Sequence, residues 1–223
     1  MLTSDGRVYN PFGSAFYASG WFNQERLLEV YQAATAWRAA NPKRYAIVTK
    51  ALLQNLYSLD GHLSDQGWCN GIAKAKYLCE DSSAWCSEFA REMFKGNINA
   101  GAYWCETDSI FGCLDNVCPE DITAVSDFKG IFGSHGGWVD RDHIWLSTAQ
   151  PGDYLTMVGS QGQHKEHSAV IVGVSHDYNT VYTEEGNVLI GNDHCVHFMS
   201  RPYFIGATLD SNLDAIGKIN SIF

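Results

Sequence analysis

The sequence has few basic residues for its length. Of its 223 residues, 15 are Lys or Arg and 25 are Asp or Glu, so the formal net charge at pH 7 is -10. A protein that binds nucleic acid needs a surplus of Lys and Arg to neutralise phosphates. The charge balance therefore argues against a nucleic-acid partner.

Long apolar runs are also missing. No stretch reaches the roughly 18 to 20 apolar residues that a membrane-spanning helix requires. Residues 1–7 lack the apolar core of a signal peptide, and no internal repeat or low-complexity tract is visible. We therefore expect no membrane span and no recognisable signal peptide in this chain.

What the sequence does contain is an apolar, aromatic-rich core composition and seven cysteines. Hydrophobic residues make up 45% and aromatic residues 13%, which is typical of a packed globular protein. If one cysteine stays free, six can form up to three disulfides in an oxidising compartment. Alternatively, several are small buried hydrophobic residues. The sequence does not give the pairing.

The first third of the chain is predicted to be helical. Apolar residues recur at three- and four-residue spacing from about residue 22, the pattern breaks at Asn41 and Pro42, and a second helix is expected over about 43–60. We interpret residues 1–65 as an N-terminal helical extension and residues 66–223 as the main domain.

A further helix is predicted to start near Cys86. Ser83 is a good N-cap, and the apolar face that follows contains Cys86, Phe89 and Met93. In the first turn of a helix, unpaired backbone N–H groups and the positive end of the helix dipole favour a thiolate. Cys86 is therefore a candidate nucleophile, although a buried core cysteine is the alternative interpretation.

The second half of the chain changes character at Pro151. Residues 97–150 are predicted to be a long irregular region, serving as a braced surface loop or as one wall of a substrate groove. Beyond Pro151, β-branched and aromatic segments predict strands over 153–158, 167–174, 180–184, 195–198 and 203–209. A cysteine helix followed by consecutive strands predicts an α+β architecture with an antiparallel sheet.

Two segments in this half carry groups that could activate a thiol. His167 begins the most apolar predicted strand, and an imidazole there can take a thiol proton and later deliver it to a leaving amine. Glu185 and Asn187 follow the next strand and could orient that imidazole. Glu184 competes with Glu185, but alternation along a strand predicts that only one of the two faces His167.

Five short segments occur in a defined order: AWCSEFA at 84–90, PGDY at 151–154, HSAVIV at 167–172, EGN at 185–187 and FIGA at 204–207. Together they resemble the CHAP domain, the cysteine, histidine-dependent amidohydrolase/peptidase branch of the NlpC/P60 group of papain-like folds. The resemblance covers roughly residues 68–209. It implies a nucleophile helix packed on an antiparallel sheet. It also implies Cys86 as nucleophile, His167 as base, Glu185 as orienting carboxylate and Asn187 as a fourth member.

The resemblance also implies a substrate, namely an amide bond of bacterial peptidoglycan, at the muramoyl-alanine bond or within the stem peptide. It is compatible with a secreted or periplasmic antibacterial effector that has an immunity or inhibitor partner, or with a phage-type lysin; we expect a monomer. Three alternatives stay open: a glutathione-conjugate amidase, a transglutaminase-like toxin, and an inactive binding module. No cofactor is expected.

Metal binding is a weaker alternative for two histidine clusters. His164 with His167, and Asp193, His194, Cys195 and His197, have ligand-type composition. Neither has the paired CxxC or HExxH form of a strong metal signature. We therefore expect no metal site.

Overall fold

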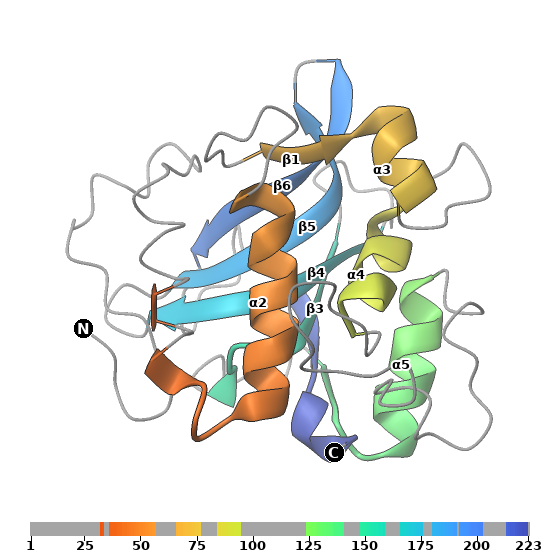
Figure 1. The fold of residues 1–223 in the computed structure, drawn as a ribbon. Helices are drawn as coiled ribbons and strands as arrows, with labels where there is room; N and C mark the ends of the chain where they lie inside the picture. Colours follow the sequence, from red (N-terminus) through yellow and green to blue (C-terminus); the bar gives the residue numbers. More distant parts are fainter. Residues whose placement is uncertain are drawn as a thin grey trace.

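The computed structural model describes residues 32–33, 36–56, 66–76, 84–94, 124–140, 148–158, 166–175, 180–190, 192–202 and 213–222. These residues form one seven-stranded sheet with helices packed across one face (Figure 1). Every pair of neighbouring strands is antiparallel. The predicted α+β class with an antiparallel sheet is confirmed.

The strands in sheet order are β1 (Gln66–Cys69), β6 (Asp193–Pro202), β5 (Thr180–Ile190), β4 (Glu166–Ser175), β3 (Tyr154–Val158), β7 (Leu213–Gly217) and β2 (Trp138–Asp140). The helices are α2 (Pro42–Leu56), α3 (Asn70–Lys76), α4 (Cys86–Phe94), α5 (Val125–Ser134) and the short 3-10 helix η7 (Ile219–Ser221). Strands β3 to β6 are consecutive in both sequence and space, so they form a meander at the centre of the sheet. No helix among the described residues is long and apolar enough to cross a membrane.

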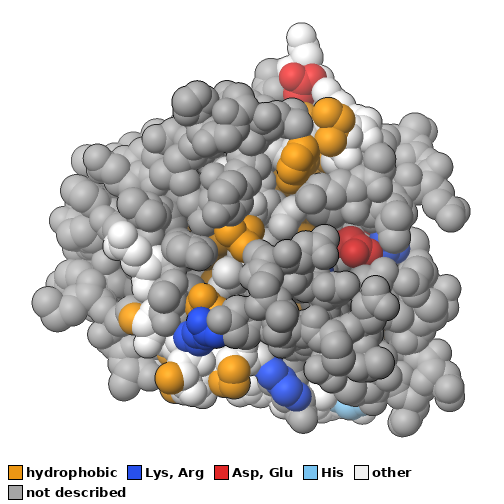
Figure 2. Space-filling view, in the orientation of Figure 1, with side chains coloured by type: hydrophobic (Ala, Val, Ile, Leu, Met, Phe, Trp, Pro, Cys, Tyr) orange, Lys and Arg blue, Asp and Glu red, His pale blue; other side chains and the backbone are white. Residues whose placement is uncertain are grey.

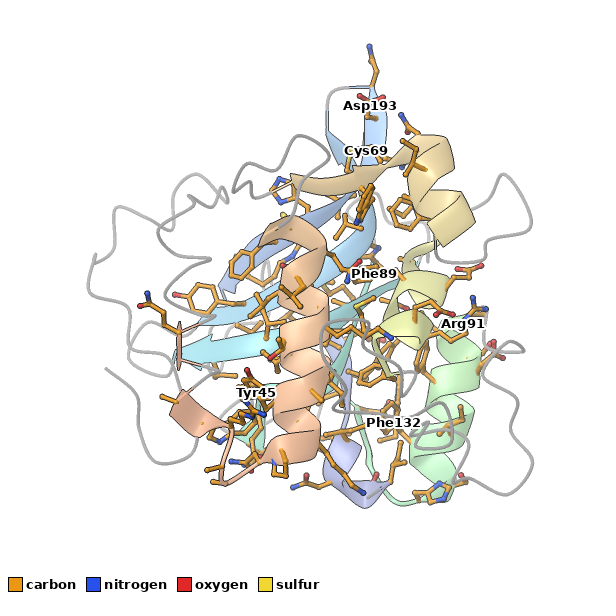
Figure 3. All side chains as sticks on the ribbon, viewed as in Figure 1. Tyr45, Cys69, Phe89, Arg91, Phe132 and Asp193 are labelled. Atoms are coloured by element: carbon orange, nitrogen blue, oxygen red, sulfur yellow. A yellow bond between two sulfur atoms is a disulfide. The ribbon has the colours of Figure 1, made fainter. Side chains whose placement is uncertain are left out.

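The main core lies between the helices and the sheet. Phe89 of α4 and Phe132 of α5 are fully buried there (Figure 3). Phe128 stacks on Tyr154 of β3 with ring centroids 4.3 Å apart. Because side chains alternate along a strand, the other face of the sheet carries a second apolar cluster, which includes Leu155 and Ile171. The central strands are therefore buried on both faces.

Helix α2 belongs to this same core. It begins at Pro42, as proline favours the first turn, where its missing N–H costs no hydrogen bond. Its buried residues Val48 and Leu52 join the cluster that contains Phe89. The predicted break at Asn41 and Pro42 is thus confirmed. The division of the chain at residue 65 stays a prediction.

Asp153, in the PGDY segment, braces the ends of several elements. Its buried carboxylate pairs with Arg44 of α2 at 2.9 Å and accepts backbone hydrogen bonds from Gln150 at 3.0 Å and Ile219 at 3.1 Å. Lys218 approaches the same carboxylate at 3.3 Å. The segment therefore joins α2, β3 and the chain after β7 by a buried charge network.

A disulfide ties the edge strand β1 to its neighbour. Cys69 is bonded to Cys195 of β6, across 126 residues of sequence (Figure 3). Cys86 is free, and Cys79, Cys105, Cys113 and Cys118 lie outside the described residues. Beyond this bridge the β5–β6 hairpin projects from the body, and Figure 2 shows hydrophobic and acidic side chains together near its end.

Two sequence predictions about the elements are wrong, and one strand was missed. The region 97–150 is not irregular throughout, because it contains α5 and β2. Helix α5 buries residues at a helical spacing, but the glycines that follow made this pattern look like a loop; the buried residues are Val125, Phe128, Ile131 and Phe132. Strands β5 and β6 extend beyond the predicted 180–184 and 195–198 because their pairing continues through a bulge. Strand β7 was not predicted. The strand predicted over 203–209 and Ser83 lie outside the described residues.

Candidate active site

Cys86 is the first residue of α4. The helix is anchored on the sheet by buried apolar side chains, among them Phe89 and Phe94, so the position of its first turn is fixed by the core. The Cys86 side chain is free of any disulfide, and the residue retains 5% of its exposure. The sulfur therefore sits where unpaired N–H groups of a helix start favour negative charge.

His167 lies near the start of β4 and contacts two other candidate residues. Its imidazole interacts with the Cys86 thiol, and its Nε2 lies 2.9 Å from Oε2 of Glu185. Because Nε2 faces the carboxylate, Nδ1 is the ring nitrogen left for the sulfur. The side chain keeps 21% exposure, so the imidazole can still be reached from solvent.

Glu185 is supplied by β5, the neighbour of β4. It stands opposite Ala169, two residues from His167 on the same face of the sheet, and its side chain is fully buried. Glu184 points to the other face, where its carboxylate accepts hydrogen bonds from Asn55 of α2 at 2.6 Å. The two glutamates therefore face opposite sides, as strand alternation predicted.

The three groups alter one another's pKa values. Burial opposes the imidazolium, but its interaction with Cys86, its hydrogen bond to the Glu185 carboxylate and the charge of Glu185 raise the pKa of His167 from 6.5 to about 10. Burial also opposes the thiolate, but the hydrogen bond and charge of His167 and the Ser168 backbone N–H lower the pKa of Cys86 overall. Both shifts have the direction that favours a thiolate–imidazolium pair.

Asn187 occupies a bulge in β5. The pairing of β5 with β6 shifts register between Glu185 and Val188, and Asn187 takes a φ of 64°. Asn tolerates this left-handed conformation better than most residues. Among the described residues, no hydrogen bond joins its side chain to Cys86, His167 or Glu185, so its predicted role as a fourth member stays a prediction.

Gly186, in the same bulge, lets α4 approach the sheet. A Cβ atom at this position would lie 2.8 Å from Cγ of Phe89 and 2.8 Å from Cζ3 of Trp85, closer than real Cβ contacts allow. Glycine is therefore required for α4 to bring Cys86 to the strand that carries Glu185. The segment EGN thus combines the carboxylate of Glu185, the close approach of α4 at Gly186 and the left-handed backbone of Asn187.

Two groups that hold Glu185 were not predicted from the sequence. Thr183 Oγ1 donates to Oε1 at 2.5 Å, while Arg201 of β6 donates from Nε to Oε1 at 2.9 Å and from Nη2 to Oε2 at 2.6 Å. Burial raises the pKa of Glu185, but the charges and hydrogen bonds of Arg201 and His167 together hold it far below its usual range. Only the register between β5 and β6 places Arg201 here, and no local pattern reveals that register.

Three buried hydroxyls connect α4 to the sheet beside the site. Ser87 Oγ lies 2.8 Å from Ser168 Oγ, and Tyr154 Oη lies 2.7 Å from the same atom. Ser87 follows Cys86 and Ser168 follows His167, so this network fixes these two candidate residues relative to each other. It too was missed by sequence reasoning.

The candidate metal clusters take other roles within the described residues. Cys195 is in the disulfide, Asp193 accepts a hydrogen bond from Asn70 at 2.6 Å, and the backbone N–H of His194 donates to Asn70 at 3.0 Å. In these parts of the chain no three His, Cys, Asp or Glu side chains are grouped to hold a metal ion. His164 lies outside them.

Comparison of the chain with family models, curated proteins and solved structures gives no match. Function is therefore inferred from the geometry and chemistry of the site.

Proposed function

We propose that this protein is a cysteine hydrolase of amide bonds, with a papain-like arrangement of nucleophile helix and sheet. One observation carries the proposal: the His167 imidazole interacts with the Cys86 thiol and is hydrogen-bonded, at 2.9 Å, to the buried Glu185 carboxylate. This order of thiol, imidazole and carboxylate is the arrangement that activates a cysteine for attack on a carbonyl.

In the first half of the reaction, the Cys86 thiolate attacks the amide carbon and a C–S bond forms. Unpaired N–H groups at the start of α4 stabilise the resulting oxyanion. The C–N bond then breaks, and the His167 imidazolium gives its proton to the departing amine. The product of this half is a thioester on Cys86 and a neutral imidazole.

In the second half, the neutral imidazole of His167 takes a proton from water, whose oxygen attacks the thioester carbon. The C–S bond breaks, the carboxylic acid product leaves, and the thiolate–imidazolium pair is restored. Glu185 stays ionised throughout and holds the protonated ring in place.

The proposed substrate is an amide of bacterial peptidoglycan, cut at the muramoyl-alanine bond or within the stem peptide. It rests on the resemblance of the five short segments to CHAP domains, three of which contain Cys86, His167 and Glu185. The disulfide between Cys69 and Cys195 supports a secreted or periplasmic location, since disulfides persist in oxidising compartments. An immunity or inhibitor protein is the partner expected of an antibacterial effector.

The test is incubation of the purified protein with peptidoglycan sacculi of several chemotypes. Mass spectrometry of the released fragments identifies the bond that is cut, and Cys86→Ala is the control that retains the fold without the thiol. We expect fragments with new amine and carboxylate ends from the native protein only. If no chemotype releases fragments while Cys86 is still reactive toward iodoacetamide, the substrate would have to be a different amide.

A further inference from the structure

Beyond Cys86, His167 and Glu185, the site contains a cation that the proposed reaction does not use. Arg201 reaches Glu185 from β6, where its backbone stands opposite Val181, so the side chain runs along the strand to meet the carboxylate. Its guanidinium retains 29% exposure, whereas the carboxylate has none.

The same oxygen serves both partners. Oε2 of Glu185 lies 2.9 Å from Nε2 of His167 and 2.6 Å from Nη2 of Arg201. A cation that shares an acceptor with an imidazolium reduces the attraction of that acceptor for the ring proton. The charge of Arg201 therefore acts on His167 through a single shared atom.

We propose that Arg201 is a positioning residue that acts on His167 through Glu185, offsetting the carboxylate charge so that the imidazole can give up its proton to the departing amine. This inference rests on the proposed function. Thr183 and the strand backbone also hold Glu185 in place. The specific contribution of Arg201 is therefore its charge more than its shape.

The other charged or titratable groups near this centre are few within the described residues. Glu88 of α4 acts on Cys86 and opposes its thiolate, and His197 of β6 stands directly opposite Glu185. Neither is hydrogen-bonded to the oxygen of Glu185 that His167 contacts. Arg201 is thus the group whose removal changes the charge beside His167 most directly.

The sign of the effect separates this role from a merely structural one. Loss of a cation raises the pKa of every group near it, so Arg201→Gln raises the pKa of both Cys86 and His167. Loosening of the site would instead separate Cys86 from His167, which raises the pKa of Cys86 but lowers that of His167. The direction of change at His167 therefore decides between the two roles.

The experiment compares the native protein with Arg201→Gln, Arg201→Lys and Arg44→Gln. Peptide mapping follows iodoacetamide modification of Cys86 across pH, and NMR follows the imidazole of His167, assigned with a His167→Ala sample. Arg44→Gln is the matched control, because Arg44 also pairs with a buried carboxylate at 2.9 Å but in the network of α2 and β3.

In Arg201→Gln, we expect iodoacetamide to modify Cys86 about threefold to tenfold more slowly at pH values below the native Cys86 midpoint. The titration midpoint of His167 should move to higher pH. Arg201→Lys, which keeps the charge, and Arg44→Gln should both leave the His167 midpoint in place. An unchanged or lowered His167 midpoint in Arg201→Gln overturns the inference. If Arg201→Gln does not fold, an upward shift in Arg201→Lys would overturn it equally. An ordinary Cys86 pKa in the native protein would instead refute the proposed function itself.

Discussion

Glu184 and Glu185 are neighbours in β5, yet their carboxylates serve opposite faces of the sheet. Glu184 accepts hydrogen bonds from Asn55 of α2 at 2.6 Å, and Glu185 bonds His167 at 2.9 Å. Both side chains are fully buried. The pair therefore offers two chemically identical positions, of which only one acts on the imidazole.

Replacement of each glutamate by Gln tests this division. In Glu185→Gln the anion beside His167 is lost while Arg201 remains, so the pKa of His167 falls below its native value of about 10. Glu184→Gln should lower the free energy of unfolding through its contact with Asn55 and leave the His167 midpoint unchanged. NMR titration of the His167 ring measures both, and equal shifts in the two variants would contradict the account.

The ion pair between His167 and Glu185 makes stability depend on pH. The folded pKa of His167, about 10, exceeds the usual value of 6.5, so its contribution to stability is complete below about pH 6.5 and is lost as the pH rises through about 10. In chemical denaturation, the stability difference between the native protein and His167→Ala should therefore shrink over that interval. A difference that is constant from pH 6 to 10 would show that the imidazole is not held charged.

Gly186→Ala should separate α4 from the strand that carries Glu185. The added Cβ would meet Phe89 and Trp85, so we expect the free energy of unfolding to fall by about 1 to 3 kcal/mol and the reactivity of Cys86 at neutral pH to drop. Gly130→Ala in α5 is the matched control. It meets nothing within 4 Å and should stabilise the helix by up to about 1 kcal/mol. Similar behaviour of the two variants would argue against close packing at Gly186.

Asn187 can be tested for a backbone role against a chemical one. With φ at 64°, Asn187→Gly should fold and keep the reactivity of Cys86, whereas Asn187→Val should lose about 1 to 2 kcal/mol of stability. Thermal unfolding and iodoacetamide modification give the two readings. A stable Asn187→Gly protein that releases no fragments from sacculi would show that the side-chain amide takes part in the reaction.

The buried hydroxyl network predicts a graded loss of stability. Ser168→Ala removes the partner of both Ser87 and Tyr154 and should cost about 1 to 3 kcal/mol, while Tyr154→Phe removes one hydroxyl and should cost less. Denaturant titration followed by tryptophan fluorescence measures both. Equal costs, or no cost for Ser168→Ala, would indicate that the network contributes little to holding α4.

Sequence patterns predicted the parts of the site that local rules determine. A helix start at Cys86, a strand start at His167 and the alternation of Glu184 and Glu185 are each visible within a few residues. Arg201 was not predictable in this way, because its reach to Glu185 depends on how β5 and β6 align around a bulge. The role of Gly186 likewise depends on the distance between a helix and a strand.

The fold shows the same limit. The antiparallel meander follows from consecutive β-type segments, but strand β7 pairs with β3 and β2, which precede it by more than fifty residues, and such pairing leaves little mark on a five-residue segment. Helix α5 was missed because the glycines that end it resemble a loop; Gly136, with a φ of 69°, makes the turn after the helix. Local composition predicts where helices and strands form better than it predicts which strands pair with each other.

The most direct test of the central claim is the pH dependence of iodoacetamide modification at Cys86 in the native protein and in His167→Ala. If the thiolate is stabilised by the imidazole, the native midpoint lies below the usual thiol pKa of 9.0. In His167→Ala it rises to or above that value, since burial, the largest influence, then outweighs the hydrogen bond from the Ser168 backbone N–H. Equal midpoints in the two proteins would contradict the account, because Cys86 would then be an ordinary buried thiol.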